Sequence, residues 1–310
     1  MSEPSLASVA AKLGSALLDA AWAQWRTLGM GVAGTKQCRS IIDPEALVFA
    51  SLWLSDTEPR LARVLRMWAA DGSRLLSVQR TRNLSPDYSA SVNAKLGGFA
   101  RHAVDKGKDL RWKPLAQGRE PAVREAWKVE QASPVLAAPG SLLLRLRVGM
   151  GVGIKPDVLA YLLGSAGARR SISAIAGATH YYTRAVRRTV EEMVAGRFID
   201  AAATAPASYH VRLEPWAKVL HLPDASPVWV YWHELFALGA ALADAASNAG
   251  RESRYLQSSR ARDVMERHRL AFDLYGVPLA PAVDHPGEEY LVALQSDVVE
   301  LARRITNNFL

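Results

Sequence analysis

Apolar side chains recur at helical spacing along most of this chain, and the patterns follow one another most closely over residues 154–220. A helix is predicted from Ile154, then a short one near residue 175 and a longer one over about 183–195. Their inward positions are Val158, Leu159, Leu162 and Leu163, then Ile172, Ile175 and Ala176, then Val186, Val190 and Met193. Two short strands, Arg197–Ile199 and Tyr209–Leu213, are predicted to complete the segment as a β-hairpin.

The helix predicted over 183–195 has a basic outward face, because its apolar stripe occupies the opposite side. Thr183 is its candidate N-cap, since a threonine hydroxyl can accept an otherwise unpaired backbone N–H. The polar residues at its start and on its outward face are Tyr181, Tyr182, Thr183, Arg184, Arg187 and Arg188. Arginines on the exposed side of a short helix can contact phosphates and base edges in the major groove of DNA.

The order helix, helix, turn, helix, hairpin resembles the winged helix-turn-helix superfamily of bacterial transcription regulators, in the ArsR- and MarR-like layout. The matching positions are Ile175-Ala176 for the usual Leu-Ala pair, Val186 for the buried Val, Val190 and Met193 for the Leu-like residues, and Gly196 before the wing. His180 stands where the turn glycine is usual, and a left-handed backbone is costlier for His. The presumed wing tip, residues 201–207, has no Lys or Arg. The resemblance covers only residues 150–220.

This resemblance implies that the protein binds double-stranded DNA. Arg184, Arg187 and Arg188 would then lie in the major groove, where arginine can bond guanine O6 and N7. Ser171, Tyr181, Tyr182 and Thr183 would hold phosphates, while Arg170 and Arg212 would position the flanks; His180 either meets phosphate or caps the turn. A homodimer is expected, because two recognition helices can occupy half-sites about one DNA turn apart.

The rest of the chain is also predicted to be helical, so the expected fold class is mainly α, with a winged helix-turn-helix domain flanked by helical regions. The expected division is an N-terminal region over 1–148, the winged domain over 149–222 and a C-terminal region over 223–310. Further helices are predicted over 5–28, 46–55, 60–70, 75–84, 90–104, 228–246, 255–275 and 288–305. Asp43 is the expected N-cap of the second of these, with Pro44 at its first position.

Two segments allow more than one interpretation. Ser141–Val148 is short and apolar, and its pattern fits a strand or a helix. The helix predicted over 288–305 has a row of apolar residues spaced alternately by three and four positions, a pattern that suits either the core or a dimer contact. The seam consists of Leu291, Leu294, Val298, Leu301 and Ile305.

Charge is distributed unevenly along the chain, whose formal net charge is +8. Residues 60–128 carry a net +9 and residues 149–222 a net +4, whereas residues 1–59 and 223–310 carry −2 and −4. A polyanion would therefore meet the middle of the chain first. Arginine-rich composition from a GC-rich genome accounts for part of the excess but not for its asymmetry. The acidic C-terminal helices are candidates for assembly or for binding a protein partner.

The basic part of the N-terminal region contains a further candidate for nucleic-acid contact. The loop 105–113 embeds Trp112 among lysines and arginines, a combination that can grip nucleic acid by charge and stacking. A solvated face or a partner contact is the alternative for this loop and for the arginines before it. Those arginines are Arg60, Arg63, Arg66, Arg74, Arg80 and Arg82.

No motif points to catalysis, a cofactor or a metal. Cys38 is the single cysteine, which excludes a disulfide framework and a multi-cysteine zinc site and suits a reducing cytoplasm. The glycines of 29–34 match G-x-G-x-x-G, but a predicted helix rather than a strand precedes them, so a linker is favoured over a dinucleotide site. No signal peptide is predicted, because residues 1–11 include an early Glu3 and lack a basic start and a clean apolar run. No membrane span is predicted, because acidic residues and His233 interrupt the apolar run over 227–246.

The sequence therefore predicts a cytoplasmic transcription regulator that is not an enzyme and needs no cofactor. Its recognition helix would be residues 183–195. The alternative hypothesis is a scaffold component that uses a winged helix to bind protein, which the uncharged wing favours. The positions of the three arginines after Tyr182 are central to the first hypothesis, because they must project into solvent.

Overall fold

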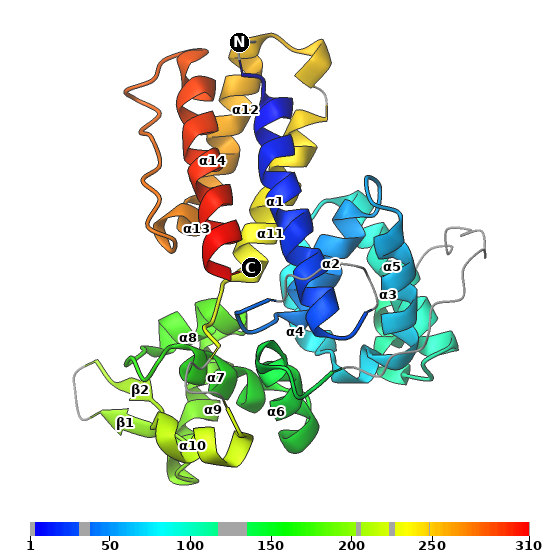
Figure 1. Cartoon of the computed structure of the whole chain (residues 1–310), viewed down its shortest axis with the longest axis vertical. Coiled ribbons are helices and arrows are strands. Elements are labelled where there is room, and N and C mark those ends of the chain that lie inside the picture. The colour runs from blue at the N-terminus through cyan, green and yellow to red at the C-terminus, as the bar shows by residue number, and fades with distance from the viewer. Residues whose placement is uncertain are drawn as a thin grey trace.

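A computed structural model describes residues 4–30, 38–116, 135–202, 206–222, 227–247 and 249–309. The protein is mainly helical, as predicted, and its only sheet within these residues is a two-stranded hairpin. Figure 1 shows three lobes. One contains segments from both ends of the described chain, a second contains the helices between residues 44 and 115, and a third contains residues 142–222.

The first lobe packs the N-terminal helix against the C-terminal helices, at the top of Figure 1. Its helices are α1 (Leu6–Thr27), α11 (Trp232–Ala246), α12 (Arg254–Arg267), α13 (Arg269–Asp273) and α14 (Glu289–Phe309). All five seam residues of α14 are fully buried, so the seam is core. The helix predicted over 255–275 is two helices, broken at His268.

The second lobe follows in the chain. Its helices are α2 (Pro44–Leu54), α3 (Arg60–Asp71), α4 (Val78–Leu84) and α5 (Ala90–Asp105), with short 3₁₀ turns at Ser73–Leu75, Ser85–Asp87 and Leu110–Leu115. Asp43 caps α2 as predicted, accepting the backbone N–H of Ala46 at 3.1 Å, and Pro44 is its first residue. On α3, Leu61, Leu65 and Trp68 face inward, as their spacing predicts.

The third lobe begins earlier than the predicted boundary at residue 149. Its elements are α6 (Leu142–Met150), α7 (Ile154–Gly164), α8 (Ile172–Thr179), α9 (Thr183–Ala195), β1 (Asp200–Ala202), β2 (Ser208–His210) and α10 (Leu213–Leu220). The strands are antiparallel and pair Ala201 with Tyr209. They lie a few residues from the predicted strand positions. On the other edge of β2, Arg170 forms one isolated antiparallel bridge with Tyr209.

Among the described residues, two hydrophobic clusters rather than three hold these lobes together. One contains residues of α1–α5 together with residues of α11–α14, so the regions predicted as N-terminal and C-terminal share a core. The other contains apolar residues of α6–α9 and the hairpin. Leu142, Leu143 and Leu146 of α6 belong to the second cluster, whereas the predicted N-terminal region includes them. Helix formation over α6 resolves the ambiguity of Ser141–Val148.

One described helix, α1, is long and apolar enough to cross a membrane by length and composition. In this structure it lies between α11 and α14, and its leucines Leu6, Leu13 and Leu17 are fully buried. Its apolar character therefore serves the core of the first lobe here. The glycine-rich stretch 29–34 lies mostly outside the described residues.

Candidate nucleic-acid interface

Helices α8 and α9 meet at a tight turn whose geometry the sequence partly explains. Ser171 caps α8 by accepting the backbone N–H of Ala174 at 3.2 Å. His180 ends α8 in the left-handed region, with φ of 57°, at the position expected for the turn glycine. A side chain is costly in this conformation, so its neighbours must stabilise it.

Hydrogen bonds from α4 supply that stabilisation. Asn83 donates its side-chain N–H to the carbonyl of His180 at 2.9 Å, and the carbonyl of Asn83 lies 3.1 Å from Nε2 of His180. Burial lowers the pKa of His180 to about 4. The turn is therefore attached to the second lobe rather than standing free.

Helix α9 has the predicted bounds, and it presents one apolar and one basic face. Val186 and Val190 are fully buried and Met193 nearly so, whereas Arg184, Arg187 and Arg188 are exposed. Thr183 is the first residue of the helix rather than its N-cap, which corrects the predicted role of its hydroxyl. The helix packs on α7 and α8, so its basic face is not covered by the other lobes in this structure.

Glu192 shapes the charge on the same face, one turn after Arg188. It accepts a bond from Arg188 Nε at 3.0 Å and pairs with Lys155 Nζ at 3.0 Å. The hydrogen bond from Lys155, with that from Arg188, lowers the pKa of Glu192. A groove of about 1060 Å³ runs between α9 and the 150–156 segment, lined by Lys155, Arg184 and Arg188. The N-terminal half of α9 is thus the more basic half.

The two tyrosines before α9 have opposite orientations. Tyr182 is 73% exposed, whereas Tyr181 is 6% exposed. The Tyr181 hydroxyl donates to Asp157 at 3.0 Å and lies 3.0 Å from Oγ of Ser77. The prediction that Tyr181 holds phosphate is therefore wrong for this structure, because its hydroxyl is used inside the protein.

The flanking residues predicted to position DNA differ in accessibility. Arg212 is exposed and pairs with Asp200 at 3.2 Å. Arg170 is only half-buried, with its guanidinium 5.9 Å from the ring centre of Tyr161. Ser171 has its hydroxyl engaged as the cap of α8. Of these three side chains, Arg212 is the most available for an external contact.

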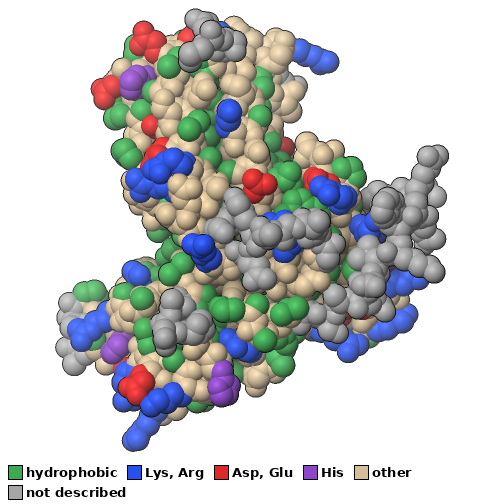
Figure 2. Space-filling view, viewed as in Figure 1, with side chains coloured by type: hydrophobic (Ala, Val, Ile, Leu, Met, Phe, Trp, Pro, Cys, Tyr) green, Lys and Arg blue, Asp and Glu red, His purple; other side chains and the backbone are tan. Residues whose placement is uncertain are grey.

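Arg82 of α4 adds a residue that the sequence pattern did not assign to this surface. It is exposed and lines a groove of about 430 Å³ together with Ser173, Tyr182 and Thr183. Its neighbour Asn83 holds the α8–α9 turn, which fixes Arg82 beside the start of α9. Arg82 lies beside the start of α9 only because α4 packs on this turn, and helical periodicity in the sequence cannot predict that packing. In the view of Figure 2, Lys and Arg side chains gather at the outer edges of the two lower lobes.

The basic residues of the second lobe only partly match the alternative nucleic-acid site. Trp112 is fully buried and packs edge-to-face on Phe99, with ring centres 5.2 Å apart. It cannot stack on a base from this position, so the predicted gripping loop is wrong in that respect. Arg80 is also buried, with 1% of its side chain exposed.

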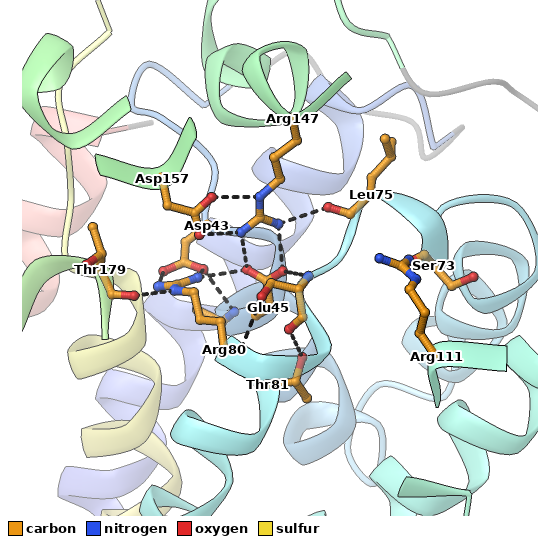
Figure 3. Close-up of polar contacts among 12 residues, drawn as sticks. Asp43, Glu45, Ser73, Leu75, Arg80, Thr81, Arg111, Arg147, Asp157 and Thr179 are labelled. Atoms are coloured by element: carbon orange, nitrogen blue, oxygen red, sulfur yellow. Dashed lines mark hydrogen bonds and ion pairs between the residues drawn. The ribbon is translucent and has the colours of Figure 1, made fainter. Parts of the chain in front are cut away.

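Arg80 belongs to a buried ion network beneath the α8–α9 turn, drawn in Figure 3. The network joins Asp43 and Glu45 at the start of α2 with Arg80 of α4, Arg147 of α6 and Asp157 of α7. No side chain in it is more than 2% exposed. It ties the second lobe to the third.

Each arginine in the network bonds two carboxylates and one backbone carbonyl. Arg80 binds Asp43 through two nitrogens, Glu45 at 2.8 Å, and the carbonyl of Thr179 at 2.8 Å. The Thr179 bond connects the network to the last residue of α8. Arg80 is thereby fixed against the turn that precedes α9.

Arg147 makes the corresponding contacts on the other side. It binds Asp157 at 2.7 and 2.8 Å and Glu45 at 2.6 and 3.0 Å, and it donates to the carbonyl of Leu75 at 2.9 Å. Three carboxylates face two guanidinium groups, so the network has one excess negative charge. Burial raises the pKa of Asp157, and the nearby Glu45 adds to the rise, whereas Arg80 lowers the pKa of Asp43 despite its burial.

Comparison with known proteins adds nothing to these observations, because no protein-family model, no curated protein and no solved structure matches the chain. The described residues also contain no group of three or more His, Cys, Asp or Glu side chains that could hold a metal ion. The candidate interface is therefore argued from its own geometry.

Proposed function

We propose that the protein binds double-stranded DNA through α9 and that residues 142–222 form a winged helix domain. The observation that carries the proposal is the exposure of Arg184, Arg187 and Arg188 on a helix whose opposite face is buried. A helix of this size fits the major groove, where arginine can bond guanine in a bidentate manner. The protein would act as a cytoplasmic transcription regulator, a role without a catalytic step.

Several features around α9 support this proposal. Tyr182, Thr183 and Arg82 lie beside the start of the helix, where they would meet phosphates on one side of the groove. Lys155 lies on the other side. The hairpin follows α9 as a wing would, with Arg212 just after its second strand. Phosphate contacts on both sides of a base-reading helix would fix its register.

The buried network supports a rigid binding surface. Arg80 holds the carbonyl of Thr179, and Asn83 holds His180, so the turn before α9 cannot move without breaking bonds to α4. Separating the buried arginines from their carboxylates would be costly, because each charged group would lose its partners in a low-dielectric interior. Because the turn is already held in place, little conformational entropy would be lost when α9 binds its partner.

The test is a salt titration. Fluorescence anisotropy with a labelled random-sequence duplex is expected to show binding at about 50 mM salt and a loss of at least tenfold by about 200 mM. A site-selection experiment on random duplexes should then enrich one sequence. Absence of binding to any duplex at low salt would overturn the proposal.

As part of the same function, we propose that the protein forms a homodimer and that its C-terminal helices bind a protein partner. Two recognition helices would bind two half-sites with greater affinity and specificity. The buried seam of α14 is not available for this contact, but Val292 and Val299 on the same helix are 53% and 44% exposed. Light scattering of V292D/V299D against the wild-type chain tests the surface, since only a dimer using it would dissociate.

A second candidate function is binding of a protein partner by the third lobe. Phe198, just before the hairpin, and Val219 of α10 are 45% and 70% exposed, and the ring of Phe198 stacks on Trp216. The hairpin tip has no Lys or Arg to hold phosphate. This function is preferred if the salt titration shows no DNA binding and F198D/V219D releases a partner that co-purifies with the wild-type protein.

A further inference from the structure

The groove between α9 and the 150–156 segment has an apolar wall that DNA binding does not require. Met150 is exposed and Val152 and Ile154 are half-buried, and all three line the groove. A duplex presents mainly charged phosphates and polar base edges to a helix in its major groove, so it would leave this wall largely unused. Apolar side chains gathered along one open groove indicate a site for an apolar ligand group.

The groove is elongated and accessible along its length. Its lining residues on α9 extend from Tyr182 to Glu192, a span of about 15 Å along a helix axis. In the opposite wall, Gly151 and Gly153 alternate with the apolar residues. A Cβ atom at either glycine would meet no other atom within 4 Å, so the space beside this wall is open. Such a shape suits a linear chain laid along α9 better than a compact ring.

The charged residues that line the groove have an excess of positive charge. Lys155, Arg184 and Arg188 provide three positive charges, and Glu192 provides the only negative one in this lining. Glu192 pairs with both Lys155 and Arg188, at 3.0 Å from each. Arg184 is exposed and has no ion-pair or hydrogen-bond partner among the residues that the structure describes. An anionic group entering the groove would therefore meet an unpaired guanidinium at Arg184.

We propose that this groove binds a linear acyl carboxylate, with its chain against Met150, Val152 and Ile154 and its carboxylate at Arg184. An arginine guanidinium matches a carboxylate in geometry and charge, and burial of the chain adds affinity in proportion to its length. A cationic amphiphile would be repelled by Arg184. The ligand would also occupy the groove beside α9 and displace DNA, a consequence that rests on the proposed DNA-binding function.

Ligand-observed NMR titrations of the full chain test the site without DNA. Octanoate is expected to bind with a Kd on the order of 1 mM, 1-octanol more weakly and octylamine most weakly. Hexanoate and butanoate should bind progressively more weakly, by about twofold for each methylene removed, which is about half of the gain for full burial because the groove is open. Absence of octanoate binding, or equal binding of butanoate and octanoate, would overturn the proposal.

Two pairs of variants test the assigned contacts. Arg184→Gln should weaken octanoate binding about tenfold, the loss expected for one charge-assisted contact, with little effect on 1-octanol. Arg187→Gln is its control, because Arg187 is exposed on the same helix but does not line the groove. Val152→Asp should abolish 1-octanol binding, whereas Val148→Asp adds the same charge at an exposed residue outside the groove and should leave it unchanged. Circular dichroism checks that each variant is folded, and equal effects within either pair contradict the assignment.

A competition titration separates the acyl site from the proposed function. If the duplex binds as proposed, octanoate at several times its Kd should displace it, whereas butanoate at the same concentration, the control for ionic strength, should not. Octanoate binding without duplex binding would support the acyl site and remove the DNA-binding proposal. Duplex binding without octanoate binding would assign the groove to DNA alone, and simultaneous binding of both would show that the groove is not shared; each of these results counts against the inference.

Discussion

Arg147 holds Glu45 by two hydrogen bonds, of 2.6 and 3.0 Å, although 102 residues separate them in the chain. Both side chains are fully buried. The pair connects α6 of the third lobe to α2 of the second, and Asp157 extends it to α7. The orientation of the third lobe thus depends on charged groups that have no access to water, in addition to apolar packing.

Breaking this network at Arg147 is expected to be severe. Arg147→Met leaves Asp157 buried without its cation and Glu45 with Arg80 alone, and it should lower the free energy of unfolding by about 3–5 kcal/mol. Urea unfolding followed by circular dichroism measures the loss. Arg188→Met is the control, since Arg188 is 84% exposed and its pair with Glu192 should be worth less than about 1 kcal/mol. Similar losses in the two variants would show that the buried network does not stabilise the fold.

The adjacent tyrosines provide a matched pair of variants for the α8–α9 turn. Tyr181→Phe removes a buried hydroxyl that bonds Asp157 and Ser77, and should cost about 1–3 kcal/mol of unfolding free energy. Tyr182→Phe removes an exposed hydroxyl and should leave stability unchanged while weakening DNA binding, if that hydroxyl holds phosphate. Thermal unfolding and the anisotropy assay separate the two effects. A stability loss in Y182F equal to that in Y181F contradicts this assignment.

The helical spacing of apolar residues is sufficient to predict much of this fold. The bounds of α9 follow from spacing, because its apolar stripe every three or four residues faces the core. The spacing of the apolar seam of α14 fits both the core and a dimer contact, and only the burial seen in the structure decides for the core. The spacing cannot predict how the chain divides into lobes, because the packing of α1 on α11 and α14 joins residues from opposite ends of the chain. Local patterns contain no information on such distant pairings.

The same limit applies to the candidate site. The exposed arginines of α9 could be assigned from their position opposite Val186 and Val190, whereas the burial of Tyr181 depends on Asp157 and Ser77, which belong to other elements. Arg80 and Trp112 were misassigned for a related reason. A charged or aromatic residue in a basic segment is expected at the surface, and only the carboxylates of Asp43 and Glu45 explain why Arg80 is buried.

Acid should destabilise the protein through His180. Its pKa is lowered to about 4 in the folded state from an ordinary value of 6.5, so the unfolded chain takes up the proton first. Its contribution to stability is therefore complete above pH 6.5 and is lost as the pH falls toward 4. Over this interval His180 should account for a loss of about 1–2 kcal/mol, allowing for its partial exposure.

His180→Asn tests this contribution, because Asn tolerates the left-handed backbone that His180 adopts. The variant should be less stable near pH 7, where it loses the contact with Asn83, but its stability should fall less between pH 6.5 and 4.5. His221→Asn is the control, since His221 is also left-handed but exposed at the end of α10. Urea midpoints at several pH values measure both. An unchanged pH dependence in H180N would contradict the predicted role.

The central prediction concerns Arg187, which lies in the middle of the basic face of α9. If it reads a base, Arg187→Ala should cost about 1–3 kcal/mol against the selected site and relax specificity at one position. Arg82→Ala should instead weaken binding to all duplexes about equally and reduce the salt dependence, as a phosphate contact does. Arg269→Ala, an exposed substitution on α13, should change neither. Anisotropy titrations against selected and random duplexes distinguish these outcomes, and unchanged binding by R187A would remove α9 as the reading helix.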